Sequence, residues 1–129
     1  MPLKRVMLRI QNCLMAVSIA NALNQSGNFL VTSASSEHGD IAEACRQASS
    51  DILLMESAYD VGATPDDCLK NAERLRSLCP RCKVIMLCDE NSVPEIARQV
   101  VQAKKDGRID DFVYSSVSES YLMALLSAL

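Results

Sequence analysis

The apolar positions of the chain form short runs that alternate with segments of helical periodicity. In the stretch 51–57, four apolar residues stand between Asp51 and Glu56 without any alternation. A run of this kind, bounded by polar residues and too short for a helix, indicates a strand buried on both faces. Other short apolar runs follow the same plan, and the five predicted strands are 4–10, 29–32, 51–55, 83–88 and 112–114.

Between these runs, apolar residues recur at the spacing of helices. Gly27 and Gly107 are each predicted to end a helix, while Thr64, Ser92 and Ser118 are predicted to cap the start of one. The predicted helices are 14–23, 41–48, 64–78, 92–107 and 118–126.

Strands that alternate with helices at such close spacing imply right-handed crossovers and a parallel sheet covered on both faces. The sequence therefore predicts an α/β fold, with a doubly wound, five-stranded parallel sheet in three layers. Residues 1–129 suit one domain in length, and they contain no internal repeat, low-complexity segment or linker.

Composition and charge exclude some classes of protein and of binding partner. Hydrophobic residues make up 49% and charged residues 22% of the chain, as in folded proteins rather than disordered ones. The net charge is −3, so we expect no direct binding of nucleic acid. A basic cluster of Lys104, Lys105 and Arg108 is interpreted as the solvated end of a helix.

No stretch reaches the run of about 20 apolar residues that spans a bilayer. The segment 14–23 is interrupted by Ser18 and Asn21, which does not fit a secretory signal. We therefore expect a cytoplasmic protein without membrane contact, in which the six cysteines are reduced thiols.

In open α/β sheets, ligands bind in the crevice beyond the carboxyl ends of the strands. The first acidic residue of the chain is Glu37, so the first strand supplies no carboxylate to this crevice. Glu56 with nearby amides is a poor site for Mg²⁺, which prefers one or two carboxylates, and we expect no cofactor. The residues that follow the relevant strands are Ile10, Gln11, Asn12, Glu56, Ser57, Cys88, Asp89, Ser115 and Ser116.

Three segments together resemble the receiver domain of response regulators in two-component signalling. They are Asp51-Ile-Leu-Leu-Met-Glu56, Val84-Ile-Met-Leu-Cys88, and the stretch from Gly107 to Asp110-Asp111-Phe112. The likeness covers nearly the whole chain and rests on hydrophobic pattern and spacing. It implies a CheY-like, or flavodoxin-like, sheet with strand order 2-1-3-4-5.

The resemblance also implies where a phosphorylation site would lie. Receivers have an acidic pair after strand one, an Asp that accepts phosphate after strand three, a Thr or Ser after strand four and a Lys after strand five. Every one of these positions departs from the pattern. The acidic pair falls on Ile10-Gln11 or Gln11-Asn12, the acceptor is Glu56, the hydroxyl position is Cys88 and the lysine position is Ser115.

A receiver that lacks all of these parts is a degenerate one, which is expected neither to be an enzyme nor to be phosphorylated at the usual site. Glu56 is then interpreted as a solvated carboxylate, with mimicry of a phosphorylated Asp as the alternative. Phe112 lies where receivers keep a switch aromatic; we interpret it as a plain core Phe, with the switch aromatic as the alternative.

The predicted function is an interaction module in bacterial signalling or gene regulation. By analogy, it docks a protein partner or a second copy through the face formed by helix four, strand five and helix five. If an effector domain follows Leu129, any DNA contact would belong to that domain.

Two other classes of function stay open. One is a divergent but active phosphoacceptor that uses Glu56. The other is a thiol-based redox sensor that uses Cys88 or the pair Cys79 and Cys82, whose spacing also fits half of a zinc site. A Ser-His-Asp hydrolase is discarded, because the single histidine, His38, follows none of the strand ends of the crevice.

Overall fold

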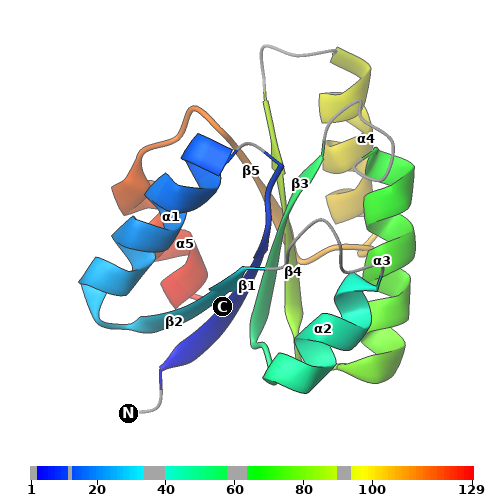
Figure 1. Ribbon diagram of the computed structural model, residues 1–129. Helices are drawn as coiled ribbons and strands as arrows, with labels where there is room; N and C mark the ends of the chain where they lie inside the picture. Colours follow the sequence, from blue (N-terminus) through cyan, green and yellow to red (C-terminus); the bar gives the residue numbers. More distant parts are fainter. Residues whose placement is uncertain (1–2, 12, 34–39, 58–63, 90–93) are drawn as a thin grey trace.

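The computed structural model describes residues 3–11, 13–33, 40–57, 64–89 and 94–129. In this part of the chain, five strands and five helices alternate (Figure 1). The strands are β1 (Lys4–Arg9), β2 (Phe29–Ser33), β3 (Ile52–Ser57), β4 (Lys83–Cys88) and β5 (Asp111–Tyr114). The helices are α1 (Cys13–Ser26), α2 (Ile41–Ala48), α3 (Pro65–Leu78), α4 (Pro94–Lys105) and α5 (Glu119–Ser127).

The strands form one parallel sheet in the order β2-β1-β3-β4-β5. Helices α1 and α5 cover one face, and α2, α3 and α4 cover the other (Figure 1). The predicted three-layer α/β fold and its strand order are therefore confirmed.

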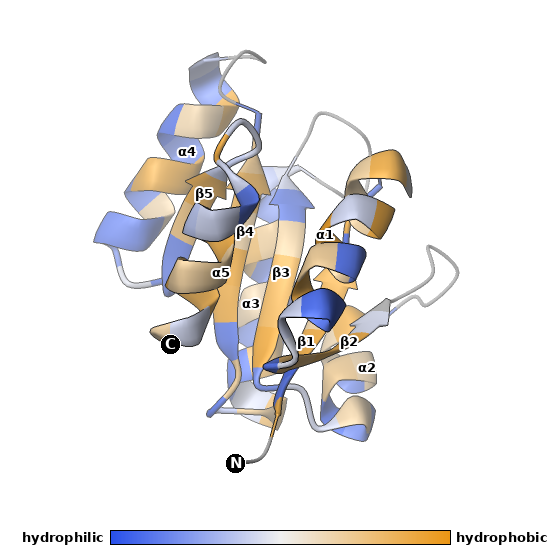
Figure 2. Ribbon diagram, turned by 90° about the vertical axis from the view of Figure 1, so that its left-hand side faces the viewer, coloured by the Kyte–Doolittle hydropathy of each residue, from blue (hydrophilic) through white to orange (hydrophobic). Residues whose placement is uncertain are grey.

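The central strand β3 supplies side chains to both faces, because successive residues of a strand point to opposite sides. Leu53 and Met55 lie in the core beneath α2, α3 and α4, while Ile52 and Leu54 lie in the core beneath α1 and α5. All four are almost completely buried. Figure 2 shows the strands as a largely hydrophobic layer between the helices.

Polar side chains begin several helices as the sequence predicts. The Thr64 hydroxyl accepts a hydrogen bond from the Asp67 N–H at 3.2 Å, and the Ser118 hydroxyl accepts one from the Tyr121 N–H at 3.1 Å. Gly27 and Gly107 have φ angles of +77° and +74°, the left-handed conformation that suits glycine after a helix. The predicted cap Ser92 lies outside the described residues.

Lys4 joins the two ends of the described chain. Its Nζ donates to the carbonyl oxygens of Ser127 at 2.7 Å and Leu129 at 2.6 Å, and lies 3.4 Å from that of Leu126. A cation suits this place, because the last carbonyl groups of a helix give its C-terminal end a partial negative charge. Among the described residues, no helix is long and apolar enough to cross a membrane.

Candidate functional site

The carboxyl edge of the sheet brings Glu56 next to the end of β1. Glu56 is half-buried, and its Oε1 accepts a hydrogen bond from the backbone N–H of Gln11 at 3.0 Å. Strand β3 runs one pleat further than the predicted end at Met55, because Glu56 and Ser57 pair with Leu87 and Cys88 of β4. The carboxylate therefore links the last rungs of the β3–β4 ladder to Gln11, the second residue after β1.

Cys88 does not share this crevice with Glu56. It is 0% exposed and belongs to the core beneath α2, α3 and α4, together with Met55 and Met86. Because side chains alternate along β3, Glu56 points to the opposite face of the sheet from Met55. Cys88 follows strand four, as the crevice residues do, but its thiol lies in the core, because its place in the alternation along β4 directs it to the face of α2, α3 and α4.

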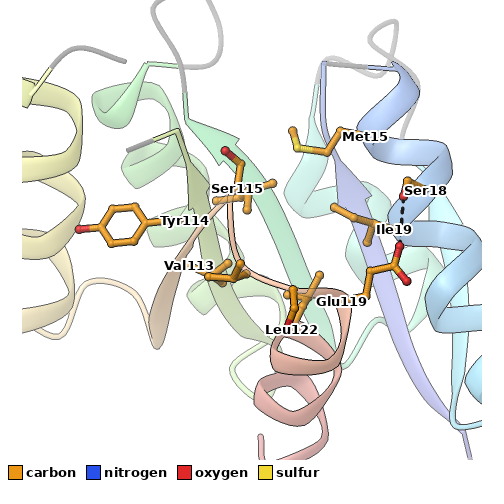
Figure 3. Close-up of a pocket in the computed structure, with 11 residues that line it drawn as sticks. Met15, Ser18, Ile19, Val113, Tyr114, Ser115, Glu119 and Leu122 are labelled. Atoms are coloured by element: carbon orange, nitrogen blue, oxygen red, sulfur yellow. Dashed lines mark hydrogen bonds between the residues drawn. The ribbon is translucent and has the colours of Figure 1, made fainter. Parts of the chain in front are cut away.

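Ser115 follows β5 directly and is exposed. Its N–H donates to the carbonyl of Cys88 at 2.9 Å, which continues the ladder between β4 and β5 by one residue. Ser115 also borders a pocket of about 240 Å³ between α1, β5 and α5 (Figure 3).

The pocket is mainly apolar, with Met15, Ile19 and Leu122 among its lining residues. Its polar groups include the Ser18 hydroxyl, which donates to Glu119 Oε1 at 3.4 Å, and the side chains of Ser115 and Ser118. Figure 3 shows the Ser18 and Glu119 side chains reaching towards each other from α1 and α5. This pocket was not predicted, because the hydrophobic pattern of α1 and α5 does not show which of their side chains leave a cavity between the two helices.

The remaining predicted site residues have ordinary structural surroundings. Ile10 is half-buried and packs against the core beneath α1 and α5, and Asn12 lies outside the described residues. Phe112 is half-buried against the other core, with its ring 5.6 Å from that of Tyr114 in an edge-on arrangement. Lys104 Nζ lies 5.6 Å from the Phe112 ring and 2.9 Å from Asp111, so Phe112 is held among several contacts.

The predicted thiol pair lies at the opposite, amino-terminal edge of the sheet. Cys79 caps the end of α3 and is half-buried, and Cys82 is buried just before β4. A third cysteine, Cys45 of α2, lies against Cys82. The helical pattern predicts that Cys45 is buried, but its neighbour could not be known without the packing of α2 on the sheet.

Another thiol, Cys68 of α3, lies under the candidate site. Its Sγ donates to the carbonyl of Glu56 at 3.6 Å, and burial raises the pKa of Cys68 to about 11. This thiol is therefore protonated at neutral pH and is a poor nucleophile. Among the described residues, no group of three or more His, Cys, Asp or Glu side chains could hold a metal ion.

Comparison with known proteins identifies the fold. No protein-family model matches the sequence, and no curated protein is significantly similar to it. Among solved structures, a CheY-like protein (TadZ) from Pseudomonas aeruginosa has 16% identity and a TM-score of 0.71, covering 97% of this chain and 98% of that one.

A DNA-binding response regulator of the LuxR family from Staphylococcus aureus has 13% identity and a TM-score of 0.75, and covers 98% of each chain. A two-component response regulator of the LuxR family from Aurantimonas has 12% identity and a TM-score of 0.74, covering 98% of this chain and 84% of that one. Matches at this level of identity establish the fold. The chain therefore has the fold of a CheY-like receiver domain, in a divergent form.

Proposed function

We propose that this chain is a receiver-like signalling module that acts by binding protein rather than by taking up a phosphoryl group. The observation that carries the proposal is the surroundings of Glu56 at the carboxyl edge of the sheet. Its carboxylate is bound to a backbone N–H, and the neighbouring strand ends contribute Ile10, Gln11 and Ser115 rather than acids and a lysine.

Phosphoryl transfer needs preorganised positive charge, usually a metal ion and a cationic side chain, around the transferred group. Of the residues that follow the strands at this edge, the polar ones are amides, hydroxyls and the carboxylates of Glu56 and Asp89, and none is a lysine. Cys88 stands where receivers have a Thr or Ser after strand four, and it is buried in the core. The arrangement therefore supports a site that keeps the shape of a receiver without its chemistry.

The test is incubation of the purified protein with Mg²⁺ and acetyl phosphate, followed by measurement of its intact mass. We expect no gain of a phosphoryl group in the wild type or in Glu56→Gln. Glu95→Gln, which changes an exposed carboxylate of α4, serves as a matched control. A Mg²⁺-dependent gain that Glu56→Gln abolishes would overturn the proposal and favour the divergent phosphoacceptor.

For the binding surface, we propose the face formed by α4, β5 and α5, with a second copy of the chain as its occupant. Val101 of α4 and Leu125 of α5 are partly exposed, and Tyr121 of α5 is 56% exposed. Lys104 of α4 and Asp111 of β5 form an ion pair at 2.9 Å, so this face carries both a positive and a negative charge. A two-fold contact brings the same patch together from both copies, so a patch with both signs avoids like-charge repulsion.

A further inference from the structure

Three cysteines gather at the amino-terminal edge of the sheet, away from Glu56. Cys45 of α2 is 0% exposed and Cys82, just before β4, is 4% exposed, and both belong to the core beneath α2, α3 and α4. Cys79, at the end of α3, is half-buried and packs against this core. All three are free thiols. The cluster thus runs from the surface at Cys79 to the interior at Cys45.

The two inner thiols are in direct contact. A hydrogen bond between the two thiols lowers the pKa of Cys45 and raises the pKa of Cys82, and the Cys82 Sγ also donates to the carbonyl oxygen of Lys83 at 3.9 Å. The Ser50 hydroxyl, which is also buried, gives Cys45 a second hydrogen bond and lowers its pKa further. Cys45 is therefore the thiol of the pair that more readily becomes a thiolate, which is the nucleophilic form.

The outer thiol is joined to Cys82 by a turn. The Cys82 N–H donates to the Cys79 carbonyl at 3.0 Å, which closes the four-residue turn Cys79-Pro80-Arg81-Cys82. Such a turn holds its first and last Cα atoms within about 7 Å. Disulfides join Cα atoms that are about 4.4–6.8 Å apart. Cys82 therefore has a possible disulfide partner on each side, one at the surface and one in the core.

We propose that these cysteines form a thiol relay, in which a peroxide oxidises Cys79 and the resulting disulfide is passed inward to join Cys45 and Cys82. In the first step, the Cys79 sulfur attacks the peroxide O–O bond, and Cys79 becomes a sulfenic acid as one water is released. The Cys82 sulfur then displaces the sulfenic hydroxyl as a second water, which also carries away the Cys82 thiol proton. This step forms the Cys79–Cys82 bond.

In the last step, the Cys45 thiolate attacks the Cys82 sulfur. The Cys79–Cys82 bond breaks, and Cys79 leaves as a thiolate that takes up the proton lost by Cys45. In total, hydrogen peroxide receives two electrons and two protons from two thiols and becomes two waters. The relay explains how two buried thiols are oxidised through a surface group, and it leaves Cys79 reduced again.

The experiment treats the whole chain with hydrogen peroxide, alkylates the remaining thiols in denaturant and maps the disulfides by mass spectrometry. We expect Cys45 and Cys82 to be linked within the chain, and Cys79 to be alkylated. Cys68→Ser is the matched control, because it removes a buried thiol outside the relay, and its oxidation should match that of the wild type.

Two variants test the order of the steps. Cys79→Ser should slow formation of the Cys45–Cys82 bond by about tenfold, since oxidant then reaches the buried pair only through local opening. Cys45→Ala should stop the relay at the Cys79–Cys82 disulfide. Circular dichroism of the reduced variants checks that each is folded. The relay is wrong if Cys45 stays alkylatable in the oxidised wild type, or if Cys79→Ser oxidises at the wild-type rate.

Discussion

At the scale of single residues, Asp40 shows how one side chain can fix the start of a helix and its packing. Its carboxylate accepts a hydrogen bond from the Glu43 N–H at 3.3 Å, which caps α2. The same carboxylate accepts a hydrogen bond from Arg74 Nε at 2.7 Å and pairs with Nη2 at 2.6 Å. Asp40 therefore ties the first turn of α2 to α3.

This geometry predicts a pH dependence of stability. The hydrogen bond from Arg74 holds the pKa of Asp40 below its ordinary value of 3.8. A carboxyl group whose pKa is lower in the folded state stabilises the protein above its unfolded pKa, and this contribution is lost as the pH falls through the folded value. The free energy of unfolding, measured with urea, should therefore fall on acidification below the ordinary pKa of Asp40.

Asp40→Asn keeps an oxygen that can cap α2 but removes the titrating group, so the acid-induced loss should become smaller in this variant. Asp66→Asn is a matched control, because Asp66 forms an exposed ion pair within α3, with Lys70 at 3.3 Å. An unchanged pH profile in Asp40→Asn would contradict the assignment.

At the same scale, the residues of the candidate site could be predicted only in part. The rule for strand ends places Glu56 and Gln11 at the carboxyl edge of the sheet, where the structure also has them, because both follow from where apolar runs stop. The hydrogen bond between them is donated by the backbone N–H of Gln11 to the Glu56 carboxylate, so the side-chain types in the sequence could not predict it. Whether Cys88 is buried depends on the register of its strand, because a shift by one residue moves every side chain to the other face of the sheet. The length of an apolar run does not define this register.

At the scale of elements, the first strand and the last helix stabilise each other through Lys4. Three carbonyl groups near the end of α5 surround its Nζ, two of them within 2.7 Å. Lys4→Met keeps the apolar stem but removes these hydrogen bonds. The free energy of unfolding should fall by about 1 kcal/mol, since bonds to a charged group are worth more than neutral ones but this site is partly exposed.

Lys83→Met gives the matched comparison, because Lys83 also begins a strand but lies 4.0 Å from its acidic partner, Asp110. Its effect in the same urea titration should be close to zero. Equal losses in the two variants would mean that the contacts of Lys4 with α5 contribute nothing specific.

The elements themselves were well predicted, because fully apolar strands and amphipathic helices leave strong patterns in a sequence. The errors lie at element ends. Helix α1 continues to Ser26, β3 extends to Ser57, and β5 begins at Asp111. In β3, the ladder to β4 continues through polar residues that the apolar run excludes. Hydrogen bonds to a neighbouring strand thus extend a strand beyond the apolar run from which it was predicted.

At the scale of the whole molecule, charge is distributed unequally between the two helical layers. Helix α1 has no charged residue, although Leu14 is 85% and Val17 is 58% exposed. Helices α3 and α4, on the other side of the sheet, carry many charges. Within the described parts of the chain, the uncharged α1 is therefore a second candidate for self-association beside the proposed face of α4, β5 and α5.

Variants on the two surfaces separate these possibilities. If a second copy binds the face of α4, β5 and α5, Tyr121→Glu should shift the protein from dimer to monomer, because it places a charge in the desolvated centre of the contact. Val17→Glu should leave the dimer intact, since Val17 lies on α1. Light scattering after size-exclusion chromatography measures the mass of each species. Dissociation by Val17→Glu alone would assign the contact to α1, and a monomeric wild type at high concentration would refute self-association through either surface.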